Sequence, residues 1–328
     1  MSSSQYTSAS NTLTQRLIAG LVFGFVVVLA LALLSDVKAV SQHIVDFRWA
    51  LFPAVLCLTL FNYLLRGFKF HYYLLQIGAE SIPIKESFRI FVAGFPLAVT
   101  PGKVGEALKG VWIHHKAPEV STARGISVVV AERISDGLAV LLLSTLGVIA
   151  YPQYWPAFFA GLVILLGIII VSQIRPLALA LLDFAAKIPV VKRFSSSLRE
   201  FYEGSFALFK PVATLVAVGL GSISWLGEGI GFYLILIGLG VAPSWEVFAI
   251  AVFILAFSTV VGAVSALPGG LGAAEASISG MLILLLGLDP GTAAAATLLI
   301  RFATLWFGVG LGLLVWFYSR DLLGLSNE

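Results

Sequence analysis

The sequence has few charged residues and no long hydrophilic stretch. Asp, Glu, Lys and Arg together make up 11% of the 328 residues, whereas soluble proteins carry about 25%. The longest hydrophilic stretch, residues 175–210, leaves no room for a separate domain outside a membrane. Hydrophobic residues make up 59% and form continuous runs rather than the alternating pattern of a β-barrel. The composition therefore predicts an all-α, polytopic transmembrane helical bundle.

The sequence also lacks the residues of most metal, disulfide and nucleotide sites. Cys57 is the only cysteine and lies in an apolar run, which excludes a disulfide and a thiol metal site. His114 and His115 are adjacent, so a helix would point them in different directions. No Gly-x4-Gly-Lys-Ser/Thr phosphate loop is present, which argues against direct use of ATP. We expect no metal, no cofactor and no nucleic-acid partner.

The most unusual stretch is residues 97–109, LAVTPGKVGEALK, where a Pro-Gly break lies within apolar sequence. Pro101 cannot extend a helix that arrives from its N-terminal side. It can open a new helix, with Thr100 as the N-cap. The alternative is an ordinary turn at the membrane surface, with no role in binding.

The residues after this break have the properties of a binding site. Three charged side chains recur at intervals of three, so they share one face of a helix. Two glycines leave room for a ligand or another backbone to approach closely. The resulting candidates for substrate binding are Gly102, Lys103, Gly105, Glu106 and Lys109.

A second stretch, residues 266–275 with the sequence ALPGGLGAAE, resembles the first. Pro268 follows Pro101 by 167 residues, and Arg301 follows Arg133 by 168. The same pattern of Pro-Gly break and later arginine therefore occurs twice in the chain, which predicts an internal repeat. Four further candidates for substrate binding follow from it: Arg133, Gly269, Gly270 and Arg301.

The apolar runs predict the membrane helices and the domain limits. We expect a disordered N-terminus at 1–15 and a single transmembrane domain at 16–322. The predicted helices are 17–34, 47–65, 121–151, 155–173, 212–239, 245–267, 271–286 and 292–318. Residues 90–99 are too short to cross, since ten helical residues span about 15 Å, half of the hydrocarbon thickness. This segment predicts a re-entrant hairpin with Pro101 near its tip.

Basic residues predict the orientation. Residues 66–85, 109–124 and 175–210 are basic and are expected to face the cytoplasm, with 175–210 lying on the membrane surface. The loops at 151–155 and 240–245 carry no basic residue and are expected outside. We therefore expect a multi-pass protein of the inner (cytoplasmic) membrane with both termini in the cytoplasm.

These orientations predict two repeats of inverted topology, at about 47–151 and 212–318. Each would contain a re-entrant hairpin, one at 84–115 and one at 245–287, entering from opposite faces. The alternative for the second hairpin is a full crossing, because residues 247–267 are long enough to span. In the repeat model the two Pro-Gly tips meet near the bilayer midplane.

Several charges lie deep within predicted membrane helices. Arg133 would lie roughly 18 Å and Arg301 roughly 15 Å from the start of their helices. Charge at that depth costs several kcal/mol and must face the bundle interior or a wet cavity. The spacing pairs Arg133 with Asp136, and a structural ion pair is the alternative to a functional site. Candidates for ion pairing or proton coupling are Glu132, Asp136, Glu228 and Glu275, with Glu275, Glu228 or a ligand phosphate as the partner of Arg301.

Together these motifs resemble one family. PGKVGEALK, the ERISD around Arg133, the WLGE at 225–228, PGGLG and the late Arg301 are similar to the flippase-like family related to the transmembrane region of bacterial lysylphosphatidylglycerol synthases. The resemblance covers residues 17–318. In the two-part synthases a soluble aminoacyl-transferase domain follows this region. This chain ends at Glu328 without one, so we expect a stand-alone member.

The resemblance implies a lipid flippase or transporter. It would move an anionic, aminoacylated or polyprenyl-linked lipid between leaflets, with the headgroup in a polar midplane cavity. The alternative is a membrane-embedded lipid-modifying enzyme, such as a polyprenyl-phosphate glycosyl or phosphoryl transferase, and a third reading is a channel. The expected partner is a membrane phospholipid or polyprenyl-linked lipid. The sequence leaves open whether the protein forms a homo-oligomer.

Overall fold

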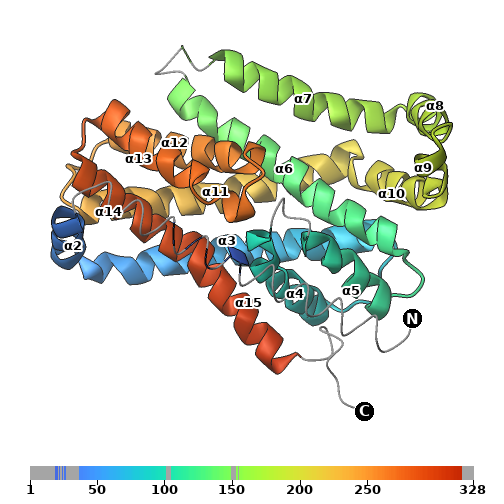
Figure 1. Ribbon diagram of the computed structural model, residues 1–328, viewed down its shortest axis with the longest axis horizontal. Helices are drawn as coiled ribbons and strands as arrows, with labels where there is room; N and C mark the ends of the chain where they lie inside the picture. Colours follow the sequence, from blue (N-terminus) through green and yellow to red (C-terminus); the bar gives the residue numbers. More distant parts are fainter. Residues whose placement is uncertain are drawn as a thin grey trace.

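The computed structural model describes residues 37–100, 105–148 and 155–319, with isolated positions at 19, 20, 22, 24, 26 and 153. Within these residues every regular element is a helix, as the composition predicts (Figure 1). The predicted disordered N-terminus, most of the predicted helix at 17–34, and the tip residues 101–104 lie outside the described residues.

The described helices follow the predicted runs closely. They are α2 (Val37–Asp46), η1 (Trp49–Leu51), α3 (Phe52–Gln76), α4 (Ile84–Ala93), η2 (Phe95–Val99), α5 (Leu108–Lys116), α6 (Thr122–Val148), α7 (Trp155–Gln173), α8 (Arg175–Ala185), α9 (Pro189–Lys192), α10 (Ser195–Leu208), α11 (Pro211–Gly238), α12 (Trp245–Val264), η5 (Pro268–Gly270), α13 (Ala273–Leu286), α14 (Pro290–Arg301), the π-helical turn η6 (Phe302–Trp306) and α15 (Phe307–Tyr318).

Five helical segments of the described chain are long and apolar enough to cross a membrane. They are Trp49–Gln76, Pro211–Gly238, Trp245–Val264, Pro268–Leu286 and Pro290–Tyr318. A sixth is present if α7 and α8, which meet at a bend of 93°, count as one span. The 27-residue α6 is as long as these spans, but Glu132, Arg133 and Asp136 interrupt its apolar sequence. The chain is a polytopic membrane protein.

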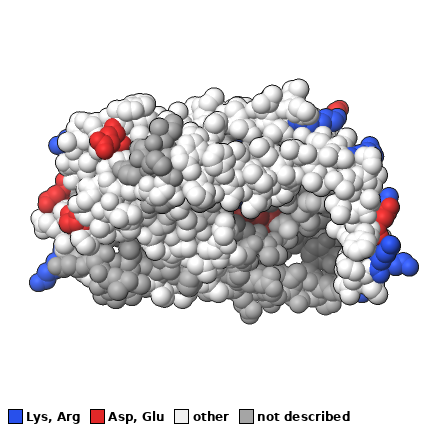
Figure 2. Space-filling view, turned by 90° about the horizontal axis from the view of Figure 1, so that it is seen from above, with Lys and Arg blue, Asp and Glu red and all other residues white. Residues whose placement is uncertain are grey.

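Charge on the surface agrees with this assignment. Figure 2 shows Lys and Arg side chains toward the two ends of the long axis, with a largely uncharged surface between them. A belt of this kind fits a bundle whose middle lies in hydrocarbon, where exposed charge is costly. The same view shows a hollow in the middle of this side face, with acidic atoms inside it.

Local sequence explains where several helices begin and end. Pro211 and Pro290 lie in the first turns of α11 and α14, where the missing N–H costs no hydrogen bond. Asp289 caps α14 by accepting a 3.0 Å hydrogen bond from the Thr292 N–H. Gly287 ends α13 in the left-handed conformation, with φ of 62°.

The two hairpins lie toward opposite ends of the bundle. In Figure 1, α4 and α5 lie in the right half, whereas α12 and α13 lie in the left half. The segments next to the two Pro-Gly breaks meet, because η2 packs against η5. Pro101 itself lies outside the described residues, so the predicted Pro101–Pro268 approach stays a prediction. The inverted repeat also stays a prediction.

Helix packing forms two apolar clusters, and buried charged residues lie beside the first. α3 lies along α11, and α6 packs against α10, α11 and α12. One apolar cluster surrounds Phe70 and Phe91, and the other surrounds Phe232 and Phe253. α3 contributes to both, and its charged residues lie in the part that belongs to the first cluster.

The structure corrects the predicted helix at 47–65. α3 begins at Phe52 and continues to Gln76, so Arg66 and Lys69 lie inside a helix and are buried, not in a basic cytoplasmic loop. Carboxylates on α6 compensate their charge, which makes this burial tolerable. In the predicted surface segment, α10 also differs from expectation, because it packs against α6 and buries Tyr202 and Leu208.

Candidate functional site

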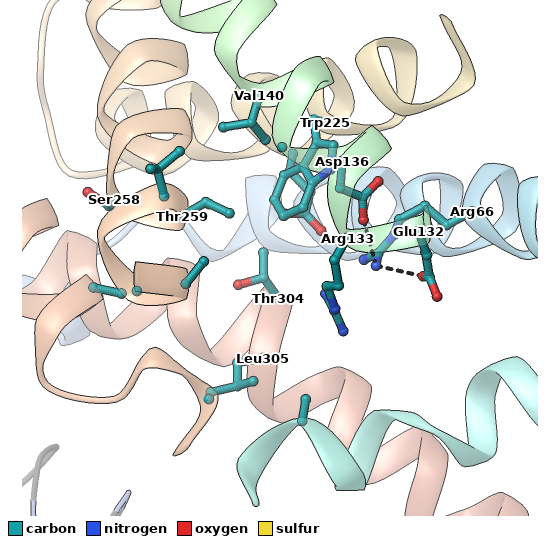
Figure 3. Close-up of a pocket in the computed structure, with 18 of the residues that line it drawn as sticks. Arg66, Glu132, Arg133, Asp136, Val140, Trp225, Ser258, Thr259, Thr304 and Leu305 are labelled. Carbon is teal, nitrogen blue, oxygen red and sulfur yellow. Dashed lines mark hydrogen bonds and ion pairs between the residues drawn. The ribbon is translucent and has the colours of Figure 1, made fainter. Parts of the chain in front are cut away.

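A cavity of about 450 Å³ lies within the bundle. The charged side chains that line it are Arg66, Glu106, Lys109, Glu132, Arg133, Asp136, Glu228 and Arg301. Figure 3 shows the charged groups of α3 and α6 on one side, and the hydroxyl side chains of Ser258, Thr259 and Thr304 on the other. The cavity therefore combines a strongly charged wall with a weakly polar one.

Arg133 borders the cavity and is held by Glu106. Its Nε lies 2.9 Å from Glu106 Oε2, and its Nη2 lies 2.6 Å from Glu106 Oε1. This bidentate geometry is the strongest form of an Arg–carboxylate contact. The Glu106 side chain is buried, whereas 39% of the Arg133 side chain is exposed. The predicted Arg133–Asp136 pair is wrong, because Glu106 supplies a planar partner from the segment before α5.

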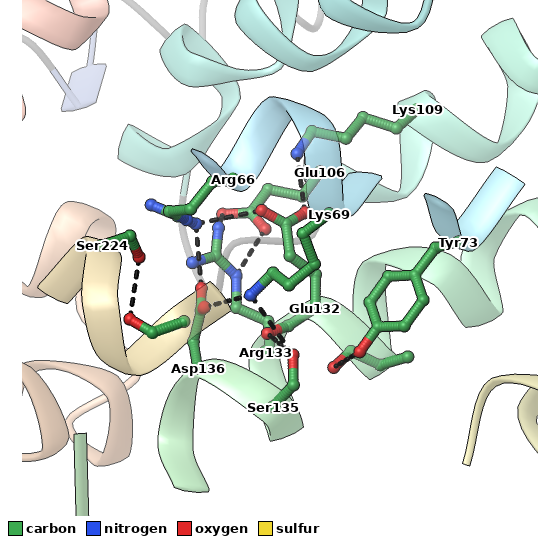
Figure 4. Close-up of polar contacts among 12 residues, drawn as sticks. Arg66, Lys69, Tyr73, Glu106, Lys109, Glu132, Arg133, Ser135, Asp136 and Ser224 are labelled. Carbon is green, nitrogen blue, oxygen red and sulfur yellow. Dashed lines mark hydrogen bonds and ion pairs between the residues drawn. The ribbon is translucent and has the colours of Figure 1, made fainter. Parts of the chain in front are cut away.

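The two carboxylates of α6, Glu132 and Asp136, hold three cations from α3 and α5. Arg66 Nη2 lies 3.0 Å from both Glu132 Oε1 and Asp136 Oδ2. Lys109 Nζ lies 3.3 Å from Glu132 Oε2, and Lys69 pairs with Asp136 (Figure 4). Because all five side chains are buried, each charge depends on its neighbours for compensation.

Lys109 reaches this network across Gly94. A Cβ on Gly94 would lie 2.0 Å from Lys109 Cε, so a larger residue at this position would force the lysine chain to move. The ammonium group lies 5.6 and 5.3 Å from the ring centroids of Phe70 and Phe91, which is within cation–π range. Two of the three charged residues predicted to share one helix face have different partners on α6: Glu106 binds Arg133, and Lys109 binds Glu132. Lys103 lies outside the described residues.

Arg301 holds the second Pro-Gly turn. Its Nε lies 2.5 Å from Glu275 Oε1, and its Nη2 donates a 2.9 Å hydrogen bond to the Gly269 carbonyl. Glu275 Oε2 in turn accepts a 2.6 Å hydrogen bond from the Gly272 N–H. Of the two protein partners considered for Arg301, Glu275 forms the ion pair.

The candidate glycines occupy different positions. Gly269 lines the cavity. Gly270 has φ of 66° and packs against α12, where a Cβ would lie 2.9 Å from Gly262 Cα. Gly105 donates a 3.0 Å hydrogen bond to Thr100 Oγ1. Because α5 begins at Leu108 and residues 101–104 are not described, the N-cap role of Thr100 stays a prediction. Gly102 lies outside the described residues.

Glu228 of α11 differs from the other carboxylates. It lines the cavity and is 5% exposed. Within the described residues its carboxylate has no hydrogen bond and no ion-pair partner. The cations that interact electrostatically with Glu228 are Arg66 and Arg301. Both already form ion pairs, Arg66 with Glu132 and Arg301 with Glu275.

Sequence reasoning missed Arg66, Lys69, Tyr63 and Trp225. The Tyr63 hydroxyl donates a hydrogen bond to the Thr304 carbonyl at the π-helical turn. The Arg66 guanidinium lies 5.7 Å from the Trp225 ring. The i, i+3 spacing of Arg66 and Lys69 within an apolar stretch was the available signal, since it places both on one helix face. No group of three or more His, Cys, Asp or Glu side chains suited to a metal ion is found among the described residues.

The sequence matches a known family model over nearly all of this fold. Residues 17–312 match the family described as "Lysylphosphatidylglycerol synthase TM region". The chain belongs to this family. The match includes all the charged residues that line the cavity.

Curated relatives come from archaea. Two matches from Methanothermobacter thermautotrophicus, each named "UPF0104 membrane protein", are 32% identical over 111 residues and 29% identical over 222 residues. They cover 34% and 60% of this chain, and 31% and 64% of the relatives. A "UPF0104 membrane protein" of Pyrococcus horikoshii is 26% identical over 267 residues, which cover 73% of this chain and 78% of the relative. No solved structure matches the chain.

Proposed function

We propose that this protein moves a lipid with an anionic headgroup between the two leaflets of a membrane. The observation that carries this proposal is the charged cavity within an apolar bundle. Its volume of about 450 Å³ lies in the range of small-ligand sites, about 300–1,000 Å³. A headgroup fits this space, whereas a whole lipid with two acyl chains does not.

An apolar groove beside the cavity supports an amphipathic substrate. The groove has a volume of about 490 Å³ and is lined by Cys57, Leu60, Phe61, Tyr63, Leu64, Phe88, Val92 and Leu311. Tyr63 lines both the groove and the cavity. A lipid would place its headgroup on the polar side of Tyr63 and its acyl chains on the apolar side.

Arg133 is the side chain best placed to meet the headgroup. It is the most exposed of the ion-paired cations around the cavity, and its guanidinium offers a fork that matches phosphate oxygens. A phosphate would compete with Glu106 for this fork, so binding and release exchange one bidentate contact for another.

Leaflet exchange in vesicles tests the proposal. The protein is reconstituted with fluorescently labelled phosphatidylglycerol, and a membrane-impermeant quencher reports how fast the label reaches the outer leaflet. We expect Arg133→Ala to slow exchange by about tenfold or more, the loss of one charge-assisted contact. The matched control is Arg199→Ala, on the exposed face of α10, which should leave the rate unchanged. Equal rates in vesicles with and without the wild-type protein would contradict the proposal.

A further inference from the structure

One carboxylate in the cavity stands apart from the rest. The four acidic candidates for proton coupling are Glu132, Asp136, Glu228 and Glu275. Three of them are committed to cations: Glu132 and Asp136 to Arg66 and the two lysines, and Glu275 to Arg301. A carboxylate in direct contact with a cation resists protonation, because protonation would leave the cation unpaired in a buried site. Glu228 lacks such a partner within the described residues, so it alone of the four can change charge without breaking an ion pair.

The charged and titratable groups around Glu228 come from three of the helices that pack on α11. α3 contributes Tyr63 and Arg66, α6 contributes Asp136, and α14 contributes Arg301. The only charged residue of α12, Glu246, lies in its first turn, and the residues of α12 at the cavity are the hydroxyls of Ser258 and Thr259. Glu228 and these hydroxyl groups line the same cavity of about 450 Å³. Water in such a polar, roomy space would give a proton a route to Glu228.

The balance of charge around the cavity depends on Glu228. The described cations are Arg66, Lys69, Lys109, Arg133 and Arg301, and the described carboxylates are Glu106, Glu132, Asp136, Glu228 and Glu275. Five of each give a formal charge of zero when Glu228 is ionised, and of +1 when it is protonated. Net charge within the hydrocarbon region is costly. Counted over these described groups, an anionic headgroup that enters with one proton on Glu228 keeps the formal charge at zero, whereas one that enters alone lowers it to −1.

We propose that Glu228 takes up one proton when an anionic headgroup enters the cavity and gives it back to water when the headgroup leaves. The inference rests on the proposed function. In this step the O–H bond of the Glu228 carboxyl group forms from a proton of water on one side and breaks toward water on the other. Because the two binding events favour each other equally, a proton gradient drives the lipid, and a lipid gradient drives protons.

Leaflet exchange as a function of pH tests the inference. Vesicles of phosphatidylcholine and phosphatidylglycerol carry the protein, labelled phosphatidylglycerol and a pH-sensitive dye in the lumen. For the wild type, we expect the rate to change by up to about tenfold per pH unit within the titration of Glu228, as for one proton. Lipid movement should also shift the luminal pH.

Two variants make the test specific. Glu228→Gln keeps the size of the side chain and removes the titration, so exchange should become independent of pH and the luminal pH should stay constant. Glu246→Gln removes an exposed carboxylate on the same bundle and should behave as the wild type. If the wild type and Glu228→Gln show the same pH dependence, the inference is overturned and lipid movement itself still stands.

A second measurement separates this outcome from failure of the proposed function. If the wild type moves no lipid at any pH, the proposed function fails for this probe. Infrared difference spectra of the protein in phosphatidylglycerol nanodiscs then decide on Glu228. A carboxyl band that titrates in the wild type and is missing from Glu228→Gln supports the proton site, and identical spectra exclude it.

Discussion

The two Glu–Arg pairs of this bundle, Glu106–Arg133 and Glu275–Arg301, use the same chemistry in different surroundings. In each, a glutamate shortly after a Pro-Gly break binds an arginine on a later helix. The Arg133 side chain is 39% exposed and, among the described residues, hydrogen bonds to Glu106 only. The Arg301 side chain is 14% exposed and binds both Glu275 and the Gly269 carbonyl. The first pair therefore borders open space with a fork that a ligand can take over, and the second fixes a backbone turn.

This difference separates a binding role from a structural one. An arginine that holds a turn cannot leave its partners without loosening that turn. An arginine whose only partner is a carboxylate can exchange it for a phosphate at little structural cost, because both accept the same two N–H groups. Sequence alone assigns both arginines the same role, whereas their contacts support our proposal that Arg133, rather than Arg301, meets the headgroup.

The largest effect should come from removing Glu275. Glu275→Ala leaves Arg301 buried without a counter-charge and also removes the acceptor of the Gly272 N–H. We expect it to lower the free energy of unfolding by about 3–5 kcal/mol, measured by denaturant titration in detergent micelles. Glu275→Gln keeps a hydrogen-bond acceptor and should lose less. A Glu275→Ala protein as stable as the wild type would break the comparison.

Gly270 tests the turn itself. Its φ of 66° and the close approach of Gly262 predict that Gly270→Ala costs about 1–3 kcal/mol. Gly280→Ala is the matched control, since a Cβ at Gly280 meets nothing within 4 Å inside α13. That change should leave stability equal or raise it by about 0.5–1 kcal/mol. Both are read as shifts of the thermal midpoint, and equal shifts would remove the claimed role of the turn.

Removing Glu106 should have a smaller effect on stability and a clear effect on binding. In Glu106→Ala, water can solvate the partly exposed Arg133, so we expect a loss of about 1 kcal/mol. The freed guanidinium should bind an anionic headgroup more tightly, so added phosphatidylglycerol should raise the thermal midpoint more than in the wild type. The same addition should not favour Glu275→Ala in this way. If it does, the two arginines share a role after all.

An exposed acidic residue gives the baseline for these buried pairs. Hydrogen bonds from the Thr292 side chain and N–H lower the pKa of Asp289 below its ordinary value. Its contribution is therefore present at neutral pH and is lost as the pH falls through the lowered pKa. Asp289→Ala should cost about 1 kcal/mol, the usual value for an N-cap. This difference from the wild type should shrink in acid, as measured by thermal midpoints at several pH values.

Much of the fold follows from local sequence, and much of the site does not. Continuous apolar runs mark α6, α7 and α11 almost to the residue, and Pro-Gly marks both hairpins. The sequence also predicts that Arg133 and Arg301 face the bundle interior, and both line the cavity. It fails at Arg66 and Lys69, which look like loop residues because the carboxylates that compensate them lie more than 60 residues away on α6. The pairing of Arg133 with Glu106 was missed for the same reason: the i+3 neighbour was visible and the long-range partner was not.

The π-helical turn after Arg301 changes which face the helix presents to its neighbours, so α14 and α15 point different residues toward the same side of the bundle. Each extra residue in a helix turns everything after it by about 100° around the axis. Without this turn, Gly308 and Gly312 would follow Arg301 on a single stripe. With it, Arg301 points toward Glu275, while a Cβ on Gly308 or Gly312 would collide with Tyr63 or Pro96. The π-helical turn therefore lets α14 pack against α13 of the second hairpin while α15 packs against α4 of the first. The Thr304 carbonyl within the turn accepts the hydrogen bond from Tyr63.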